Sequence, residues 1–133
     1  MLNSFVVDFQ LRQKVTAHLS FFFLYQLPIP RLAETDSAFR PLVERAARLV
    51  GTTAEFDDLL KEIFGAKATH HTHGERTPEG RARLRADLDG LVAHLYGLTA
   101  PEFAHILSTF PLVSESVKAA ALIAYRTTAV ARV

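Results

Sequence analysis

The sequence predicts a mainly α-helical fold of the α+β type, with about five helices and one or two strands near the N-terminus. From residue 37 onward, apolar residues recur at spacings of three and four, which is typical of amphipathic helices. Helix-start patterns such as Thr77-Pro78-Glu79 divide this part of the chain. By contrast, the stretch from His18 to Leu27 is a short run of bulky apolar residues. With 133 residues, 49% of them hydrophobic, the chain suits a single domain or a domain fragment.

Residues 1–32 are predicted to form an aromatic helix–strand segment. Asn3 or Ser4 can cap a first helix that reaches about Val15. A short apolar run fits either a helix or a strand, and we favour a buried strand over residues 18–27, ended by Pro28 and Pro30. A single strand cannot satisfy its own backbone edges, so we expect a second strand or another polypeptide to pair with it.

Residues 36–65 are predicted to hold two helices. The first begins near Ser37, keeps Pro41 in its first turn and ends at Gly51. Thr52-Thr53-Ala54-Glu55 has the pattern of a capping box and opens a second helix that ends at Phe64.

Residues 66–76 lack apolar periodicity and are predicted to form an exposed, mobile His-rich loop. Imidazoles at His70, His71 and His73 could bind Zn²⁺, Ni²⁺ or Cu²⁺. No carboxylate or thiolate stands at ligand spacing beside them, so a solvated loop is the favoured interpretation.

Residues 77–133 are predicted to form the C-terminal helices. The first runs from Thr77 to about Gly97, and a capping box at Thr99-Ala100-Pro101-Glu102 opens the second. Ser114 is expected to cap an alanine-rich last helix that reaches Val130.

Composition and motifs exclude several classes of function. The absence of cysteine excludes disulfides, zinc–thiolate sites and thiol nucleophiles. A formal net charge of +1 does not by itself indicate nucleic-acid binding. The chain has no phosphate-binding glycine loop, no nucleophile elbow and no H-E-x-x-H motif, so we predict neither catalytic nor cofactor-binding residues. No segment reads as a signal peptide or a membrane span, and a cytoplasmic protein is expected.

Two local groups of basic residues are candidate DNA contacts. The first, next to the aromatic stretch, is Arg12, Lys14 and His18. The second lies in the run that contains Arg76 and Arg81, followed by Arg83 and Arg85. Four acidic residues balance the second run, which favours a solvated helix face there. Consecutive phenylalanines at 21–23 could stack on bases, but packing in the core is the favoured interpretation.

Two stretches are distinctive when taken together. The first is Leu2-Asn3-Ser4-Phe5-Val6-Val7-Asp8-Phe9, followed by Arg12-Gln13-Lys14-Val15, His18-Leu19-Ser20-Phe21-Phe22 and Gln26-Leu27-Pro28-Ile29-Pro30. The second is residues 83–89, followed by Leu91-Val92-Ala93-His94-Leu95-Tyr96-Gly97-Leu98-Thr99, Phe103, Ile106-Leu107 and Thr109-Phe110-Pro111. In content, order and spacing they resemble the target-recognition region and helical C-terminal tail of large restriction–modification adenine-specific DNA methyltransferases.

That resemblance covers most of the chain and implies a non-catalytic portion of such an enzyme. The family transfers a methyl group from S-adenosylmethionine to N6 of a flipped adenine. Its glycine-bearing cofactor loop and its Asn/Asp-Pro-Pro-Tyr/Phe element are both absent here, where Ile29 separates Pro28 from Pro30. S-adenosylmethionine is therefore implied for the full-length enzyme only, and the partners implied are DNA and the methyltransferase core. The alternative is a small helical interaction module, or a homo-oligomer, that does not bind DNA.

Overall fold

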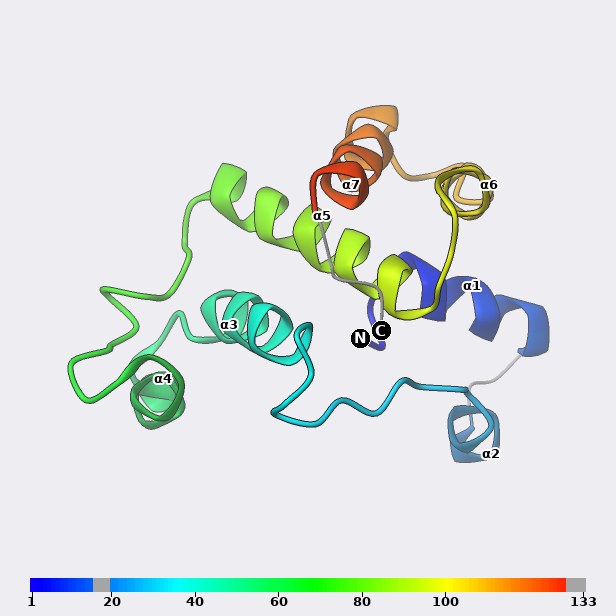
Figure 1. Cartoon of the computed structure of the whole chain (residues 1–133). Coiled ribbons are helices and arrows are strands. Elements are labelled where there is room, and N and C mark those ends of the chain that lie inside the picture. Colours follow the sequence, from blue (N-terminus) through cyan, green and yellow to red (C-terminus); the bar gives the residue numbers. More distant parts are fainter. Residues whose placement is uncertain (16–19, 129–133) are drawn as a thin grey trace.

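The computed structural model describes residues 1–15 and 20–128, and over these residues the chain is entirely helical (Figure 1). The helices are α1 (Phe5–Lys14), α2 (Phe21–Tyr25), α3 (Phe39–Val50), a single 3₁₀ turn (Ala54–Phe56), α4 (Asp57–Phe64), α5 (Pro78–Leu95), α6 (Ala100–Ser108) and α7 (Glu115–Thr127). The predicted mainly helical class is thus confirmed. The predicted N-terminal strand is not present among the described residues.

Helix α5 is the centre of the fold, and α1, α3 and α7 pack against it. Its 18 residues give a length of about 27 Å, and it crosses the molecule with α3 on one side and α7 on the other (Figure 1). Thr77 caps its first turn by accepting a hydrogen bond from Gly80 N (3.1 Å), and Pro78 occupies the first helical position. The helix start predicted from Thr77-Pro78-Glu79 is confirmed.

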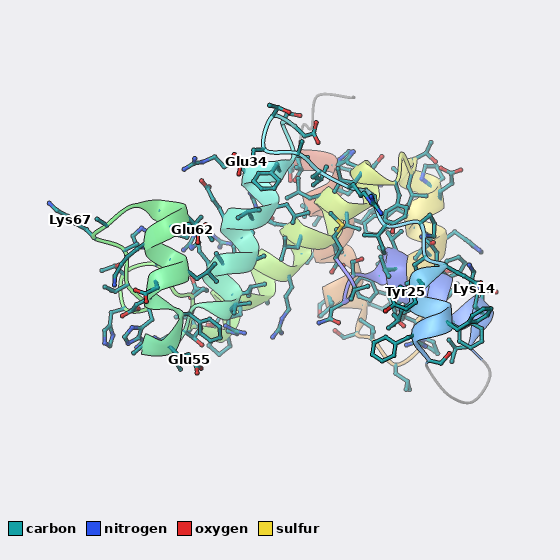
Figure 2. All side chains as sticks on the ribbon, turned by 90° about the horizontal axis from the view of Figure 1, so that it is seen from below. Lys14, Tyr25, Glu34, Glu55, Glu62 and Lys67 are labelled. Atoms are coloured by element: carbon teal, nitrogen blue, oxygen red, sulfur yellow. The ribbon has the colours of Figure 1, made fainter. Side chains whose placement is uncertain are left out.

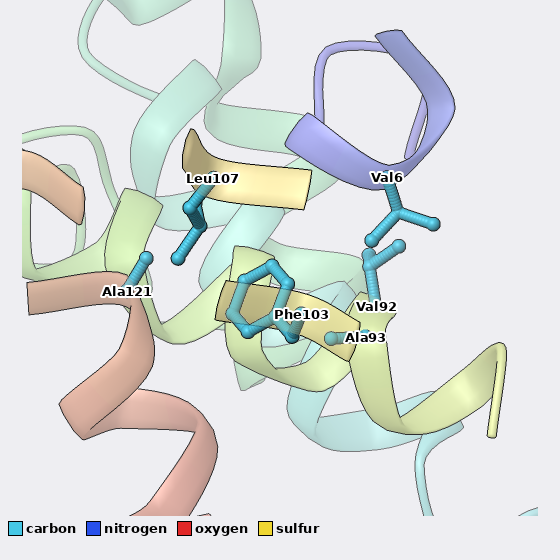
Figure 3. Packing of buried hydrophobic residues seen from close by; sticks show 6 residues of the cluster. All are labelled: Val6, Val92, Ala93, Phe103, Leu107 and Ala121. Atoms are coloured by element: carbon cyan, nitrogen blue, oxygen red, sulfur yellow. The ribbon is translucent and has the colours of Figure 1, made fainter. Parts of the chain in front are cut away.

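The main hydrophobic core joins α1, α5, α6 and α7 around Phe103, which is fully buried (Figure 3). The other buried members are Val6, Val92, Ala93, Leu107 and Ala121. Helix α6 enters this core through the predicted capping box. Thr99 N donates to Glu102 Oε2 (2.7 Å), and Glu102 N donates to Thr99 Oγ1 (3.4 Å).

A smaller cluster of Ala47, Leu60 and Ala68 holds α3 and α4 together with residues 66–76, which we call the histidine segment. The capping box predicted to open α4 does not form. Instead, Thr53 Oγ1 donates to Glu55 Oε1 (2.9 Å), and a 3₁₀ turn precedes the helix. Helix α4 ends at Gly65, whose φ of 101° favours glycine.

The strand predicted over residues 18–27 is wrong where the structure describes it, because Phe21–Tyr25 is a helix. Phe23 N and Leu24 N donate to Ser20 O at 3.1 and 3.4 Å, so the backbone groups bond within the turn. The physical reason is that no described segment offers a strand edge, and a short apolar run then satisfies its backbone locally.

Candidate functional site

Arg12 lies on the last turn of α1, where Asp8 and Phe110 hold its guanidinium in place. Its Nε donates to Asp8 Oδ1 (3.2 Å) and its Nη2 to Oδ2 (3.0 Å). The guanidinium carbon lies 4.6 Å from the centre of the Phe110 ring. The hydrogen bond to Asp8 raises the pKa of Arg12, so this exposed side chain is a permanent cation.

Lys14 joins the end of α1 to the end of α2. Its Nζ donates to the carbonyl of Gln26, the residue that follows α2, at 3.5 Å. Figure 2 shows Lys14 and Tyr25 at the same end of the molecule. His18, the third member of this predicted basic group, lies outside the described residues.

Helix α2 presents an exposed aromatic ridge beside these two cations. Phe21, Phe22 and Tyr25 are 73%, 66% and 85% exposed. The rings of Phe21 and Tyr25 stack with their centres 6.1 Å apart, because residues four apart share one face of a helix. The prediction that residues 21–23 pack in the core is therefore wrong for Phe21 and Phe22, and Phe23 is only half-buried. We call Arg12, Lys14, Phe21, Phe22 and Tyr25 the α1–α2 surface.

The second predicted basic pair makes local contacts instead of a free surface. Arg81 Nη1 donates to the carbonyls of Leu49 (3.0 Å) and Glu75 (2.9 Å), which ties the start of α5 to the end of α3. Arg76 Nη2 donates to His71 Nδ1 (2.9 Å). Arg81 therefore has a structural role that leaves fewer of its donors for a phosphate.

The structure does not bring the two basic groups together. Arg76 and Arg81 lie at the N-terminal end of α5, whereas α1 packs near its C-terminal half, where Val6 meets Val92. The two groups therefore lie toward opposite ends of α5. A single contact site would have to use one group or the other.

The histidine segment is more closely packed than an exposed loop. Ala68 is buried, Glu75 N donates to Arg48 O (2.8 Å), and Gly74 lies against the backbone of Gly51. His73 stacks on Phe64 with ring centres 4.7 Å apart.

The three histidines engage different partners. His70 donates from its backbone N to Asp57 Oδ1 (2.7 Å), and its Nδ1 lies 2.8 Å from the same oxygen. His71 accepts from Arg76, while His73 Nδ1 pairs with the hydroxyl of Thr72. Within residues 1–15 and 20–128, no three His, Asp or Glu side chains come together as a metal site.

The backbone hydrogen bond from His70 lowers the pKa of Asp57, and the ring hydrogen bond acts in the same direction. The carboxylate therefore stays ionised and fixes both the backbone and the ring of His70. This pair anchors the histidine segment to the first turn of α4.

Asp89 has a structural role that the sequence did not predict, because its place among charged residues of α5 indicated a solvated face. Its Oδ1 accepts a hydrogen bond from Phe5 N (3.0 Å), the first amide of α1. Burial raises the pKa of Asp89 to about 6. The available signal was spacing, since Asp89 precedes buried Val92 by three residues and so shares its face.

Two further findings bear on function. None of the described helices has the length and apolar character needed to cross a membrane. Comparisons with protein-family models, curated proteins and solved structures gave no match to this chain.

Proposed function

We propose that this chain is the non-catalytic C-terminal DNA-recognition or scaffold portion of an adenine-specific DNA methyltransferase of a restriction–modification or phage-defence system. The observation that carries the proposal is the α1–α2 surface. It lies within the first stretch of the family resemblance and combines exposed rings with two cations. Rings and cations at one surface suit contact with nucleic acid and with an adjoining protein surface.

In this role the chain positions DNA and leaves the chemistry to the methyltransferase core. Lys14 and Arg12 contact phosphates, and the aromatic ridge packs against the core or the DNA. S-adenosylmethionine binds to the core, because this chain lacks the cofactor loop. The location that follows is the cytoplasm, where the DNA substrate is found.

A second candidate function is a helical interaction module that does not bind DNA. The specific observation in its favour is that residues 20–30 carry no charge, although Phe21, Phe22 and Tyr25 are exposed. An uncharged aromatic ridge suits an apolar protein surface.

Fluorescence anisotropy with a labelled DNA duplex tests the proposal, at about 50 and about 200 mM salt. The chain is measured alone and with the polypeptide encoded directly upstream of it. We expect binding that weakens with salt and tightens with that polypeptide. Arg12→Ala with Lys14→Ala should lower the salt slope by about 1 for each lost phosphate contact.

The matched control is Lys61→Ala with Lys67→Ala, which removes the same charge from α4 and the segment after it; Figure 2 shows Lys67 at the opposite end of the molecule from Lys14. It should leave the duplex affinity unchanged. The proposal would be contradicted if the chain bound no duplex, either alone or with the upstream polypeptide, and formed no complex with that polypeptide. This result would favour the interaction module.

A further inference from the structure

Helices α5 and α7 make the most extensive contact between any two described helices, and their backbones approach most closely at Gly90. A Cβ atom on Gly90 would lie 2.7 Å from Tyr125 N, so only glycine permits this approach. Beside this contact, the two helices line a groove of about 580 Å³. Its apolar lining consists of Ala82, Ala86, Val117, Ala120, Ile123 and Ala124. We call it the α5–α7 groove.

The outer face of α7 carries no charge along most of its length. Between Glu115 and Arg126, every exposed residue is uncharged, and Val117 and Ile123 are 46% and 59% exposed. The one cation in this stretch, Lys118, is largely buried and pairs with Glu115 (2.8 Å). A solvent-facing helix normally carries charged residues on its outer face, so this face has the composition of an interface.

The groove has the shape that takes side chains of another helix. Four of its six apolar lining residues are alanines, whose short side chains leave depth between the two helices. Its volume falls within the range of about 300–1,000 Å³ that is usual for binding clefts. Large side chains from one face of an amphipathic helix would fill such a space, as in other helix-in-groove interactions.

Charged residues on the rim of the groove indicate which residues should flank the apolar face of a partner helix. Asp87 accepts from Arg45 Nε (3.3 Å), which neutralises its charge, whereas Asp89 accepts from the uncharged amide of Phe5 (3.0 Å). Arg83 and Arg85 also line the groove, and neither forms an ion pair with another described residue. The charge that the rim exposes to a partner is therefore mainly that of the two arginines, because Arg83 and Arg85 are exposed, whereas Asp89 is only partly exposed and is directed at Phe5 N.

We propose that the α5–α7 groove binds an amphipathic helix of a protein partner, with its apolar face in the groove and Asp or Glu opposite Arg83 and Arg85. A second copy of this chain is a poorer occupant. Two-fold pairing through this face would gather the same two arginines of both copies in one interface. The inference rests on α5 and α7 alone and does not depend on DNA binding.

Two synthetic helical peptides test this inference by fluorescence anisotropy with the full chain. One carries leucines at i, i+3, i+4 and i+7 with glutamates on both flanks, and the other has lysine in place of each glutamate. We expect the glutamate peptide to bind at least about tenfold more tightly.

Variants of the full chain then locate the site. Ala120→Arg should weaken binding of the glutamate peptide at least about tenfold, because the new side chain fills the groove. Ala119→Arg is the matched control, since Ala119 is exposed on the same helix and does not line the groove. Arg83→Glu with Arg85→Glu should reverse the preference toward the lysine peptide.

Three results would overturn the proposal, provided that circular dichroism shows folded variants. The first is equal affinity for the two peptides, or no binding of either. The second is an equal effect of Ala120→Arg and Ala119→Arg. The third is a dimer, measured by light scattering, that Ala120→Arg dissociates, because a second copy would then occupy the groove.

Discussion

Helices α6 and α2 both carry large apolar side chains, but α6 buries them and α2 leaves most of them exposed. Phe103 on α6 is fully buried, whereas Tyr25 on α2 is 85% exposed. Helix α6 has nine residues, so Phe103, Ile106 and Leu107 gather on one face, which packs between neighbouring helices. Helix α2 has five residues, all of them Phe, Leu or Tyr, so it is apolar on every side and packing on one side leaves other rings exposed. Burial therefore follows from helix length and available partners, and hydrophobic composition alone does not decide it.

The largest effect expected from this comparison is at Phe103. Phe103→Ala should lower the free energy of unfolding by about 3–5 kcal/mol, because it empties the centre of the main core. Urea denaturation followed by far-UV circular dichroism measures this loss. Phe21→Ala is the matched control and should change it little, since Phe21 is 73% exposed. Equal losses in the two variants would contradict the contrast between α6 and α2.

A smaller effect is expected in the histidine segment, which is held by backbone contacts and polar groups. A Cβ atom on Gly74 would overlap the carbonyl oxygen of Gly51, so Gly74→Ala must displace the segment from the end of α3. We expect a loss of about 1–3 kcal/mol. Faster hydrogen exchange should appear in residues 66–76, while amides of α6 stay protected.

Lys67→Ala is the control for this variant, because Lys67 is an exposed residue of the same segment. Unchanged exchange in Gly74→Ala would show that the segment is not held by its approach to Gly51.

Asp89, which joins α5 to α1 in the main core region, should make the free energy of unfolding depend on pH. Its pKa is about 6 in the folded chain, above the ordinary value of 3.8, so the folded state binds the proton more tightly. The free energy of unfolding should therefore rise as the pH falls from about 6 to about 4. Below that range, Asp57, Glu75 and Glu102 act in the opposite sense, because hydrogen bonds lower the pKa of each of them.

Asp89→Asn should remove the rise and stabilise the chain by about 1–2 kcal/mol at pH 7, since an amide oxygen still accepts from Phe5 N without a buried charge. Urea denaturation at several pH values measures both effects. The highly exposed Asp58 provides the control variant, Asp58→Asn. Parallel pH profiles for Asp89→Asn and the unaltered chain would contradict this assignment.

Sequence patterns predicted the parts of the fold that depend on local rules. The starts of α5 and α6 follow from Thr77-Pro78 and from Thr99 with Glu102, whose capping contacts the structure contains. Helix α3 ends at Gly51, as predicted. Such signals act within one turn, so a single sequence contains all the information they need.

The sequence could not predict contacts between distant residues. Asp89 caps α1 across 84 positions, and Gly74 meets Gly51 only once the chain has folded. The strand prediction failed because the choice for a short apolar run depends on whether another strand is present to pair with it. The prediction that Phe21 is buried failed for the same reason. It depended on composition, which does not show whether a packing partner is present.

The smallest effect on stability, and the sharpest test of the α1–α2 surface, is expected from Phe21→Ala combined with Tyr25→Ala. Both rings are exposed and contact mainly each other, so the free energy of unfolding should change by no more than about 0.5 kcal/mol. Binding of duplex DNA, or of the upstream polypeptide, should weaken in the same variant, as measured by anisotropy. If stability fell as far as in Phe103→Ala, the ridge would belong to the core and α2 would not differ from α6. If stability and binding both stayed unchanged, the ridge would have no part in recognition, and the cations alone would carry any contact with DNA.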